Sequence, residues 1–230
     1  MKYADTVRGE FVRRLNRFAA EVAVGGITEI AHVKNSGRLK ELLVPGAEII
    51  LERPANLQRK TKYSVIAAKK NGAWVNVDSQ APNAVVHEAL LAGRIPEISP
   101  VTHVKREVSW GGSRFDLYFE GGGRKGFIEV KGVTLEQDGV ALFPDAPTER
   151  GAKHIRELAA AVQAGYAGIA FFLLQRNDCR AFSPHEQMDK PFAGALRQAA
   201  QAGVQIVAYD SVVTEDEIVI GKPVEVQLGK

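Results

Sequence analysis

The sequence predicts a two-domain protein of the α+β or α/β class. A small OB-like β-barrel is expected over residues 1–80, and a mixed sheet flanked by helices over residues 81–216. Short strand-like segments separated by turn residues fill the first 80 residues. The segment SQAPN at 79–83 ends this rhythm, and the hydrophobic period then changes from that of strands to that of helices. Beyond it strands and helices alternate, which is typical of a sheet covered by helices.

Strand-like segments organise the predicted barrel. They are rich in apolar and β-branched residues and are separated by turns such as Gly25-Gly26, Pro45-Gly46 and Asn71-Gly72. About five short strands with this spacing favour a small barrel, and an OB-like barrel satisfies the pattern. Strands are expected at 17–24, 27–33, 47–52, 62–69 and 73–77, with a short helix at 39–43.

The second domain is predicted to alternate strands and helices. A helix at 84–93 carries Val85, Val86, Ala89 and Leu90 on one stripe and ends at Gly93. The segment 167–175 is apolar on both faces, as expected of a buried central strand. Further strands are expected at 103–110, 113–132 and 204–210, helices at 150–165 and 192–203, and the strand-like end at 217–230 is expected to pack on the first domain.

The charge is unevenly distributed along a chain whose formal net charge is only +3. Residues 1–80 hold 14 Lys and Arg against 8 Asp and Glu, whereas the remaining 150 residues hold 16 against 19. A basic first domain indicates a polyanionic partner, with nucleic acid the usual case, or else a solvated lysine-rich surface.

Cysteine content and hydropathy exclude several classes of protein. Cys179 is the single cysteine, so an internal disulfide is excluded, and no Cys/His cluster has zinc spacing. The longest apolar run, 167–174, is too short to cross a bilayer, so no membrane partner is expected. The first residues lack a signal-peptide pattern, and we expect a cytoplasmic protein.

The hairpin SRFDLYFEGGGRKGFIEVKG at 113–132 is the most informative stretch. Alternation sends Phe115 and Leu117 to a core face and Asp116 to a polar face, which Glu129 shares on the second strand. With a two-residue turn at Gly122-Gly123, opposed residue numbers sum to 245, and Asp116 faces Glu129 with Cβ atoms roughly 5 Å apart. Like charges so placed are destabilising unless something neutralises them.

A divalent cation would neutralise this pair of acids. Asp116, Glu129 and the carbonyl of Val130 form the partial oxygen cage that Mg²⁺ prefers, and Mn²⁺ accepts similar ligands. Lys131, on the same face, would orient or deprotonate a water or stabilise charge on a phosphate. Glu88, which flanks the buried stripe of the helix at 84–93, is either a third carboxylate of this site or a surface glutamate.

The alternative for the hairpin is a surface element in which Arg114 and Lys131 form cross-strand salt bridges with the acids. An aspartate on one strand with a Glu-x-Lys on the next is a short and common pattern, so by itself it would favour this surface interpretation. Three features favour the metal site: the opposed register, the shared face of Lys131, and the alternating strands and helices that follow.

Basic residues supply candidate phosphate contacts in both domains. Thr148 is placed to cap the helix that starts near residue 150, and cations in the first turns oppose the helix dipole, so a bound phosphate would explain them. The candidates on this helix are Arg150, Lys153 and His154; those in the barrel are Lys34, Arg38, Arg59, Lys60 and Lys62. A solvated basic surface is the alternative for each.

Several motifs, taken in order, resemble the sugar fermentation stimulation protein A family. They are HVKNSGRLKELLVPG, EALLAGRI, SRFDLYF, EVKGVTL, LFPDAPTERGAKHIREL and FSPHEQMDKPFAGALRQAAQAGV. The resemblance implies an N-terminal OB-like domain and a C-terminal domain similar to PD-(D/E)xK nucleases, with Asp116, Glu129 and Lys131 at the motif positions and Glu88 as the helix carboxylate. It also implies DNA binding and a link to the regulation of sugar (maltose) metabolism.

Two functions follow from these patterns. The first is a nuclease that hydrolyses DNA with Mg²⁺ or Mn²⁺, with single-stranded DNA among the candidate substrates. Its barrel would track the backbone and stack bases on an aromatic such as Tyr63 or Phe18. The second is a DNA-binding regulator that does not cleave. The sequence carries both acids and the lysine, which favours the nuclease, and it leaves the oligomeric state and the form of the nucleic acid open.

Overall fold

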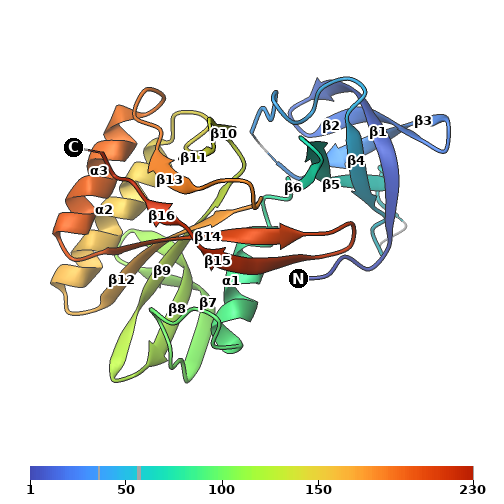
Figure 1. The fold of residues 1–230 in the computed structure, drawn as a ribbon. Coiled ribbons are helices and arrows are strands. Elements are labelled where there is room, and N and C mark those ends of the chain that lie inside the picture. Colours follow the sequence, from blue (N-terminus) through green and yellow to red (C-terminus); the bar gives the residue numbers. More distant parts are fainter. Residues whose placement is uncertain (36, 56–57, 230) are drawn as a thin grey trace.

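The computed structural model describes residues 1–35, 37–55 and 58–229, and these residues form two domains side by side (Figure 1). A β-barrel from the first part of the chain lies beside a larger domain of sheets and helices. The last strand of the barrel ends at Asn76 and the first helix of the larger domain begins at Ala81.

The first domain is an OB-type barrel. Its strands are β1 (Thr6–Asn16), β2 (Ala19–Val24), β3 (Ile27–Val33), β4 (Glu48–Glu52), β5 (Tyr63–Lys70) and β6 (Ala73–Asn76). They pair in the order β3-β2-β1-β4-β5-β6, and a parallel pairing of β3 with β5 closes the barrel. Closure removes the exposed edges that a short open sheet would present.

Two details of the barrel differ from the expectation. The 11-residue strand β1 was not predicted, because its many charged residues obscure the alternation that buries Phe11. The helix expected at 39–43 is a turn. Leu39 has a φ of 50°, which a right-handed helix does not allow, although Leu39, Leu42 and Leu43 are all buried in the barrel core.

The second domain is a sheet covered by helices on both faces. Strands pair in the order β15-β14-β12-β9-β8-β7, and a four-stranded sheet, β10-β11-β13-β16, lies beside them. The helices are α1 (Ala81–Leu91), α2 (Glu149–Gln163) and α3 (Lys190–Gln201). The strands are β7 (His103–Trp110), β8 (Ser113–Gly121), β9 (Arg124–Val133), β10 (Glu136–Gln137), β11 (Val140–Phe143), β12 (Ala167–Leu174), β13 (Ala181–Pro184), β14 (Gln205–Val213), β15 (Ile218–Pro223) and β16 (Glu225–Val226).

Strand β12 confirms the predicted central strand. It lies between two parallel neighbours, β9 and β14. Ile169, Phe171 and Leu173 pack in the cluster that contains α1, whereas Ala170 and Phe172 pack in the cluster that contains α2 and α3. Such two-sided burial is the reason that this segment reads as a continuous apolar run.

The hairpin of β8 and β9 has the predicted register. Gly122 and Gly123 have φ values of 58° and 73°, as a two-residue turn of type I′ requires, and Leu117 pairs with Ile128. The ladder ends at that pair. Phe115, expected on the face of Leu117, packs instead with Phe127 in the cluster below α2, because the two strands diverge beyond Leu117.

The C-terminal strands complete the second domain, contrary to the expectation that 217–230 packs on the barrel. Strand β15 pairs with β14, and β16 pairs with β13. Only the start of the segment reaches the beginning of the chain, through a bridge between Lys2 and Glu217. Lys230 lies outside the described residues.

One apolar cluster contains residues of both domains. Ile50, Ile66 and Ala67 of the barrel belong to the same buried cluster as α1 and the inner face of β12. None of the helices in the described ranges has both the length and the apolar character needed to span a membrane.

We expect Ile66→Ala to destabilise the protein by about 2–5 kcal/mol, because it leaves a cavity where the domains meet. Ile27→Ala in the same barrel is the matched control, since Ile27 is 65% exposed, and its effect should stay within about 0.5 kcal/mol. Urea unfolding followed by circular dichroism measures both. Equal effects would contradict a shared core.

Candidate functional site

Asp116, Glu129 and Lys131 line one cavity of about 280 Å³, which we call the carboxylate cavity. Its walls come from β8, β9, α1 and the first turns of α2. The remaining lining residues are Ser79, Asn83, Glu107, Arg114, Phe115, Val130, Phe143, Thr148, Arg150, Gly151 and His154. The fold therefore brings together the three hairpin residues that the sequence singled out.

Glu129 is a buried carboxylate with one satisfied oxygen and one unsatisfied oxygen. Only 2% of the residue is exposed. Its Oε1 accepts from Lys131 Nζ at 2.5 Å and lies 2.6 Å from His154 Nδ1. Its Oε2 is buried without a hydrogen-bond partner in the described chain. A buried carboxylate oxygen without a partner is costly, so Oε2 is a position where a bound cation would be favourable.

Asp116 is held where β8 and β9 separate. Its Oδ1 accepts from Asn83 Nδ2 on α1, and its Oδ2 accepts from the Val130 amide, both at 2.8 Å. On the other side β7 keeps its register past Asp116, since Arg106 pairs with Leu117 and Val108 with Phe115, but the Glu107–Asp116 pair between them is missing from the ladder, and Glu107 has a φ of 55°. Asp116 therefore lies outside the regular ladder on both of its neighbouring strands.

The donor set fits a divalent cation that keeps part of its water shell. Two carboxylates and the Val130 carbonyl are oxygen ligands, and the unsatisfied Glu129 Oε2 is already desolvated. Residues 1–35, 37–55 and 58–229 contain no group of three or more His, Cys, Asp or Glu side chains placed to hold a metal ion. Water or a phosphate oxygen would therefore complete the coordination.

His154 is a partner of Glu129, not the exposed phosphate contact that was predicted. The residue is only 7% exposed, and its second ring nitrogen, Nε2, lies 3.4 Å from Arg150 Nε. An arginine can only donate, so Nε2 accepts and Nδ1 donates to Glu129. This pair of bonds fixes the orientation of the ring. Sequence reasoning missed the role because a histidine in a basic helical turn gives no sign of its burial.

The other two cations of this helix point to different places. Arg150 is exposed and lines the carboxylate cavity. Lys153 is also exposed, but it donates to the Gly112 carbonyl at 3.1 Å and lies 3.6 Å from Glu157. Thr148 caps α2 as predicted, since its Oγ1 accepts from the Gly151 amide at 3.0 Å.

Glu88 lies outside the carboxylate cavity, against the expectation of a third carboxylate. Its side chain is 57% exposed and its Oε2 lies 2.6 Å from the amino group of Met1. Glu88 is five residues beyond Asn83 on α1, so the two side chains project from different faces of the helix. The group that α1 brings to the site is the Asn83 amide, and nothing in the spacing of the sequence distinguishes it.

Most of the predicted barrel contacts are engaged elsewhere. Lys34 lies 2.7 Å from Glu52 and 3.2 Å from Asp78; burial alone would lower its pKa, but these two acids outweigh burial and raise it. Lys62 pairs with Glu29 at 2.6 Å, and Arg59 donates to Ser64 at 3.4 Å. Arg38 and Lys60 are exposed.

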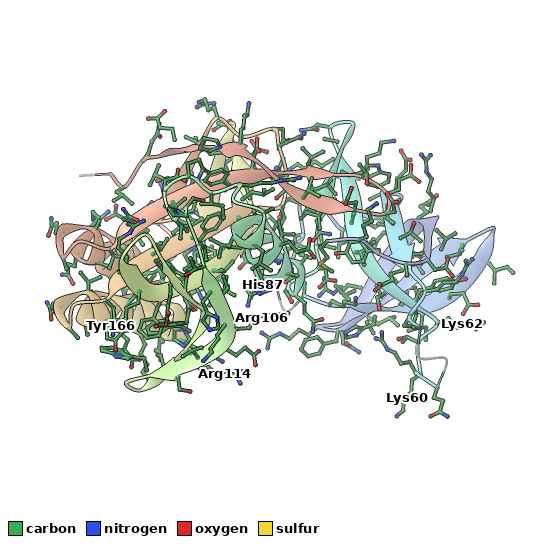
Figure 2. All side chains as sticks on the ribbon, turned by 90° about the horizontal axis from the view of Figure 1, so that it is seen from below. Lys60, Lys62, His87, Arg106, Arg114 and Tyr166 are labelled. Atoms are coloured by element: carbon green, nitrogen blue, oxygen red, sulfur yellow. The ribbon has the colours of Figure 1, made fainter. Side chains whose placement is uncertain are left out.

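The exposed cations near the carboxylate cavity come from the second domain. Figure 2 shows Lys60 and Lys62 on the barrel, well separated from Arg106 and Arg114 on the second domain. Arg114 lines the cavity and lies 3.5 Å from Glu107. Arg114 and Arg150, and not Lys60 or Lys62, are thus the exposed cations that line the carboxylate cavity.

Comparison with known proteins identifies relatives of the whole chain. A family model described as the sugar fermentation stimulation protein RE domain matches residues 80–217, and one described as the SfsA N-terminal OB domain matches residues 12–77. A sugar fermentation stimulation protein homolog of Alkaliphilus oremlandii is 49% identical over 231 residues, covering 98% of each chain. One of Desulfitobacterium hafniense is 49% identical over 228 residues, covering 99% of each.

A solved structure has the same fold. It is described as the structure of Pyrococcus furiosus SfsA in complex with Ca²⁺. It matches with a TM-score of 0.91 at 28% identity and covers 99% of this chain and 98% of its own. Sequence and fold together show that the chain belongs to the SfsA, or sugar fermentation stimulation protein, family.

Proposed function

We propose that the protein is a divalent-metal-dependent nuclease that hydrolyses phosphodiester bonds in DNA at the carboxylate cavity. The observation that carries the proposal is the buried, unsatisfied Oε2 of Glu129 beside Asp116 and Lys131. A purely structural ion pair would satisfy both oxygens of a carboxylate with 2% exposure. The family resemblance, which implies a second domain similar to PD-(D/E)xK nucleases, agrees with this assignment.

Mg²⁺ or Mn²⁺ would be held by Asp116, Glu129 and the Val130 carbonyl. The Ca²⁺ complex of the Pyrococcus furiosus relative supports a divalent cation in this fold. When bound, such a cation supplies charge stabilisation for a phosphate and activation of a nucleophile. Glu129 Oε1 stays with Lys131 and His154, which leaves Oε2 for the cation.

The chain's own residues orient the reacting phosphate. The Lys131 ammonium, 18% exposed and anchored on Glu129, is placed to donate to a phosphate oxygen and to orient the attacking water. Arg114 and Arg150 line the same cavity and would bind the flanking phosphates. Water adds to phosphorus as the bond to one sugar oxygen breaks, and the proton released by the water balances the leaving alkoxide.

His154 acts as a positioning residue for Glu129. Its hydrogen bonds to Glu129 and Arg150 connect the buried carboxylate to the cavity rim on α2. Partners of this kind typically affect metal affinity by about 10–100-fold when removed. Asn83 on α1 is likewise a positioning residue for Asp116, to which its amide group donates a hydrogen bond.

We expect Glu129→Gln to abolish Mg²⁺- or Mn²⁺-dependent cleavage, because the variant loses a negatively charged ligand of the cation. We expect Lys131→Met to reduce kcat by about 10²–10³-fold, because it loses the ammonium group that would stabilise charge on the reacting phosphate. The measurement is a panel of labelled single-stranded DNA, double-stranded DNA and RNA oligonucleotides with each metal. Glu120→Gln, an exposed acid on the same hairpin, is the control that should keep full activity.

Cleavage by Glu129→Gln at the wild-type rate would contradict the assignment of the site. Wild-type protein that binds a defined DNA site but cleaves nothing in the panel would favour a non-catalytic DNA-binding regulator instead. Circular dichroism of each variant separates loss of activity from loss of fold.

We expect Mn²⁺ to stabilise the protein against thermal unfolding, by about 2.7 kcal/mol at one hundred times its Kd. The gain should vanish in Asp116→Asn and persist in Glu120→Gln, because Asp116 lines the carboxylate cavity with Glu129 whereas Glu120 does not. Differential scanning calorimetry with Mn²⁺ and with EDTA measures it. An equal gain in both variants would place the cation elsewhere.

A further inference from the structure

A second cavity, about 340 Å³ in volume, opens between the two domains, and we call it the junction cavity. The barrel contributes Arg17, Asn35 and Gly37, whereas the second domain contributes residues 132–135, 142–148 and Gln175. The junction cavity and the carboxylate cavity share Ser79, Phe143 and Thr148. The two cavities are therefore consecutive parts of one groove that leads from the acids to the barrel.

The barrel wall of the groove is organised by Arg14. Burial lowers the pKa of its guanidinium. The side chain donates to carbonyl oxygens of the two barrel loops beside the cavity, at Asn16, Arg17, Asn35, Gly37 and Arg38. These bonds hold the 16–18 turn against Asn35, Gly37 and Arg38, so this wall is formed before any ligand binds.

The wall that the second domain contributes meets the barrel at Gly37 and at Gln175. A Cβ atom on Gly37 would lie 2.5 Å from Asp145 Oδ2, so the barrel loop and the 144–148 loop approach as closely as a glycine permits. Asn35 and Gln175 are held by bonds to the barrel itself, from Asn35 Nδ2 to the Val77 carbonyl and from Gln175 Nε2 to Asn76. The groove thus has two rigid walls that come from different domains.

An exposed aromatic residue marks the barrel end of the groove. Phe18, next to Arg17, is 51% exposed although it is large and apolar. Its ring stacks on His32 with centroids 6.4 Å apart and an interplanar angle of 26°, and the Arg17 guanidinium lies 5.6 Å from the ring centroid. An exposed ring beside an arginine is the arrangement on which an unpaired base stacks.

We infer that the groove binds a single strand of nucleic acid, with the reacting phosphate in the carboxylate cavity and the continuing strand passing over Ser79 onto Arg17 and Phe18. The inference takes the identity of the ligand from the proposed function and adds its strandedness and its path. Each cavity has an arginine in its lining beside the residues that the two cavities share: Arg150 in the carboxylate cavity and Arg17 in the junction cavity.

The dimensions of the groove favour one strand over two. Each cavity has the size of a site for a small ligand. A duplex, whose major groove alone is about 12 Å wide, would have to separate the two domains to reach the same path. Those domains are joined by a common core through Ile50 and Ile66, so the groove does not open as a hinge would. The bases of an unpaired strand are also free to stack.

The test measures binding of a fluorescent dT15 oligonucleotide and of a blunt 15-base-pair duplex by anisotropy, in EDTA so that nothing is cleaved. Wild-type protein should bind the single strand at least tenfold more tightly. Arg17→Gln should weaken binding about fivefold and reduce the salt slope by about 0.7, the value for one phosphate contact on a single strand. Phe18→Ala should weaken it about fivefold or more, as loss of one stacked base does.

Two matched variants control for charge and apolar surface. Arg13→Gln removes an exposed arginine that pairs with Glu21 outside the groove, and Ile27→Ala removes an exposed apolar side chain of the same barrel. Both should bind as the wild type does. Equal affinity for duplex and single strand, or wild-type binding by Arg17→Gln and Phe18→Ala, would overturn the inference.

The cleavage panel separates this inference from the proposed function. If the wild type cleaves DNA but the groove variants bind and cleave unchanged, the strand path is wrong and the nuclease assignment stands. If single-strand binding depends on Arg17 and Phe18 but no metal supports cleavage, the nuclease assignment fails and the groove remains a binding site.

Discussion

The parallel pairing of β9 with β12 is the constraint on which the rest of the structure depends. The ladder runs from Gly126 opposite Ala167 to Val133 opposite Leu174, and it buries β9 between β12 and β8. Gly126 is needed there, because a Cβ would lie 2.1 Å from the Ala167 carbonyl. Glu129, in the middle of this strand, is only 2% exposed. Glu129 must therefore find its partners inside the protein, and α2 supplies His154 for that purpose.

The site results from a conflict between a regular hairpin and two acids. A continued ladder would set Asp116 directly opposite Glu129, which is unfavourable for like charges. The structure avoids this by ending the ladder at Leu117 and by giving Asp116 the Val130 amide and Asn83 as partners. Each acid is thus stabilised by its own donors, and one oxygen of Glu129 remains available. Glu129 Oε2 is the atom that the proposed cation would contact.

The attachment of the barrel to the second domain has a functional consequence as well as a structural one. Ile50 and Ile66 bury the barrel in the core beneath α1, and this fixes the turn and loop around Arg17 and Asn35 against the 144–148 loop. The groove between the domains is therefore a permanent feature. Without the shared core, the Arg14-organised wall would be only a barrel surface, and the junction cavity would lack its barrel side.

The sequence alone determined the elements whose residues repeat with a clear period or contain turn glycines. These include the central strand at 167–174, the stripe of α1 and the register of the hairpin from Gly122-Gly123, which together located Asp116, Glu129 and Lys131. It did not reveal the charged strand β1 or the turn at Leu39, where tertiary burial overrides local pattern. Only the tertiary structure decided which side chains meet: Asn83 rather than Glu88 at Asp116, His154 at Glu129, and Lys34 on Glu52 and Asp78. The physical reason is that a local pattern fixes which face a residue occupies, whereas a polar group's partner depends on what the fold packs against that face.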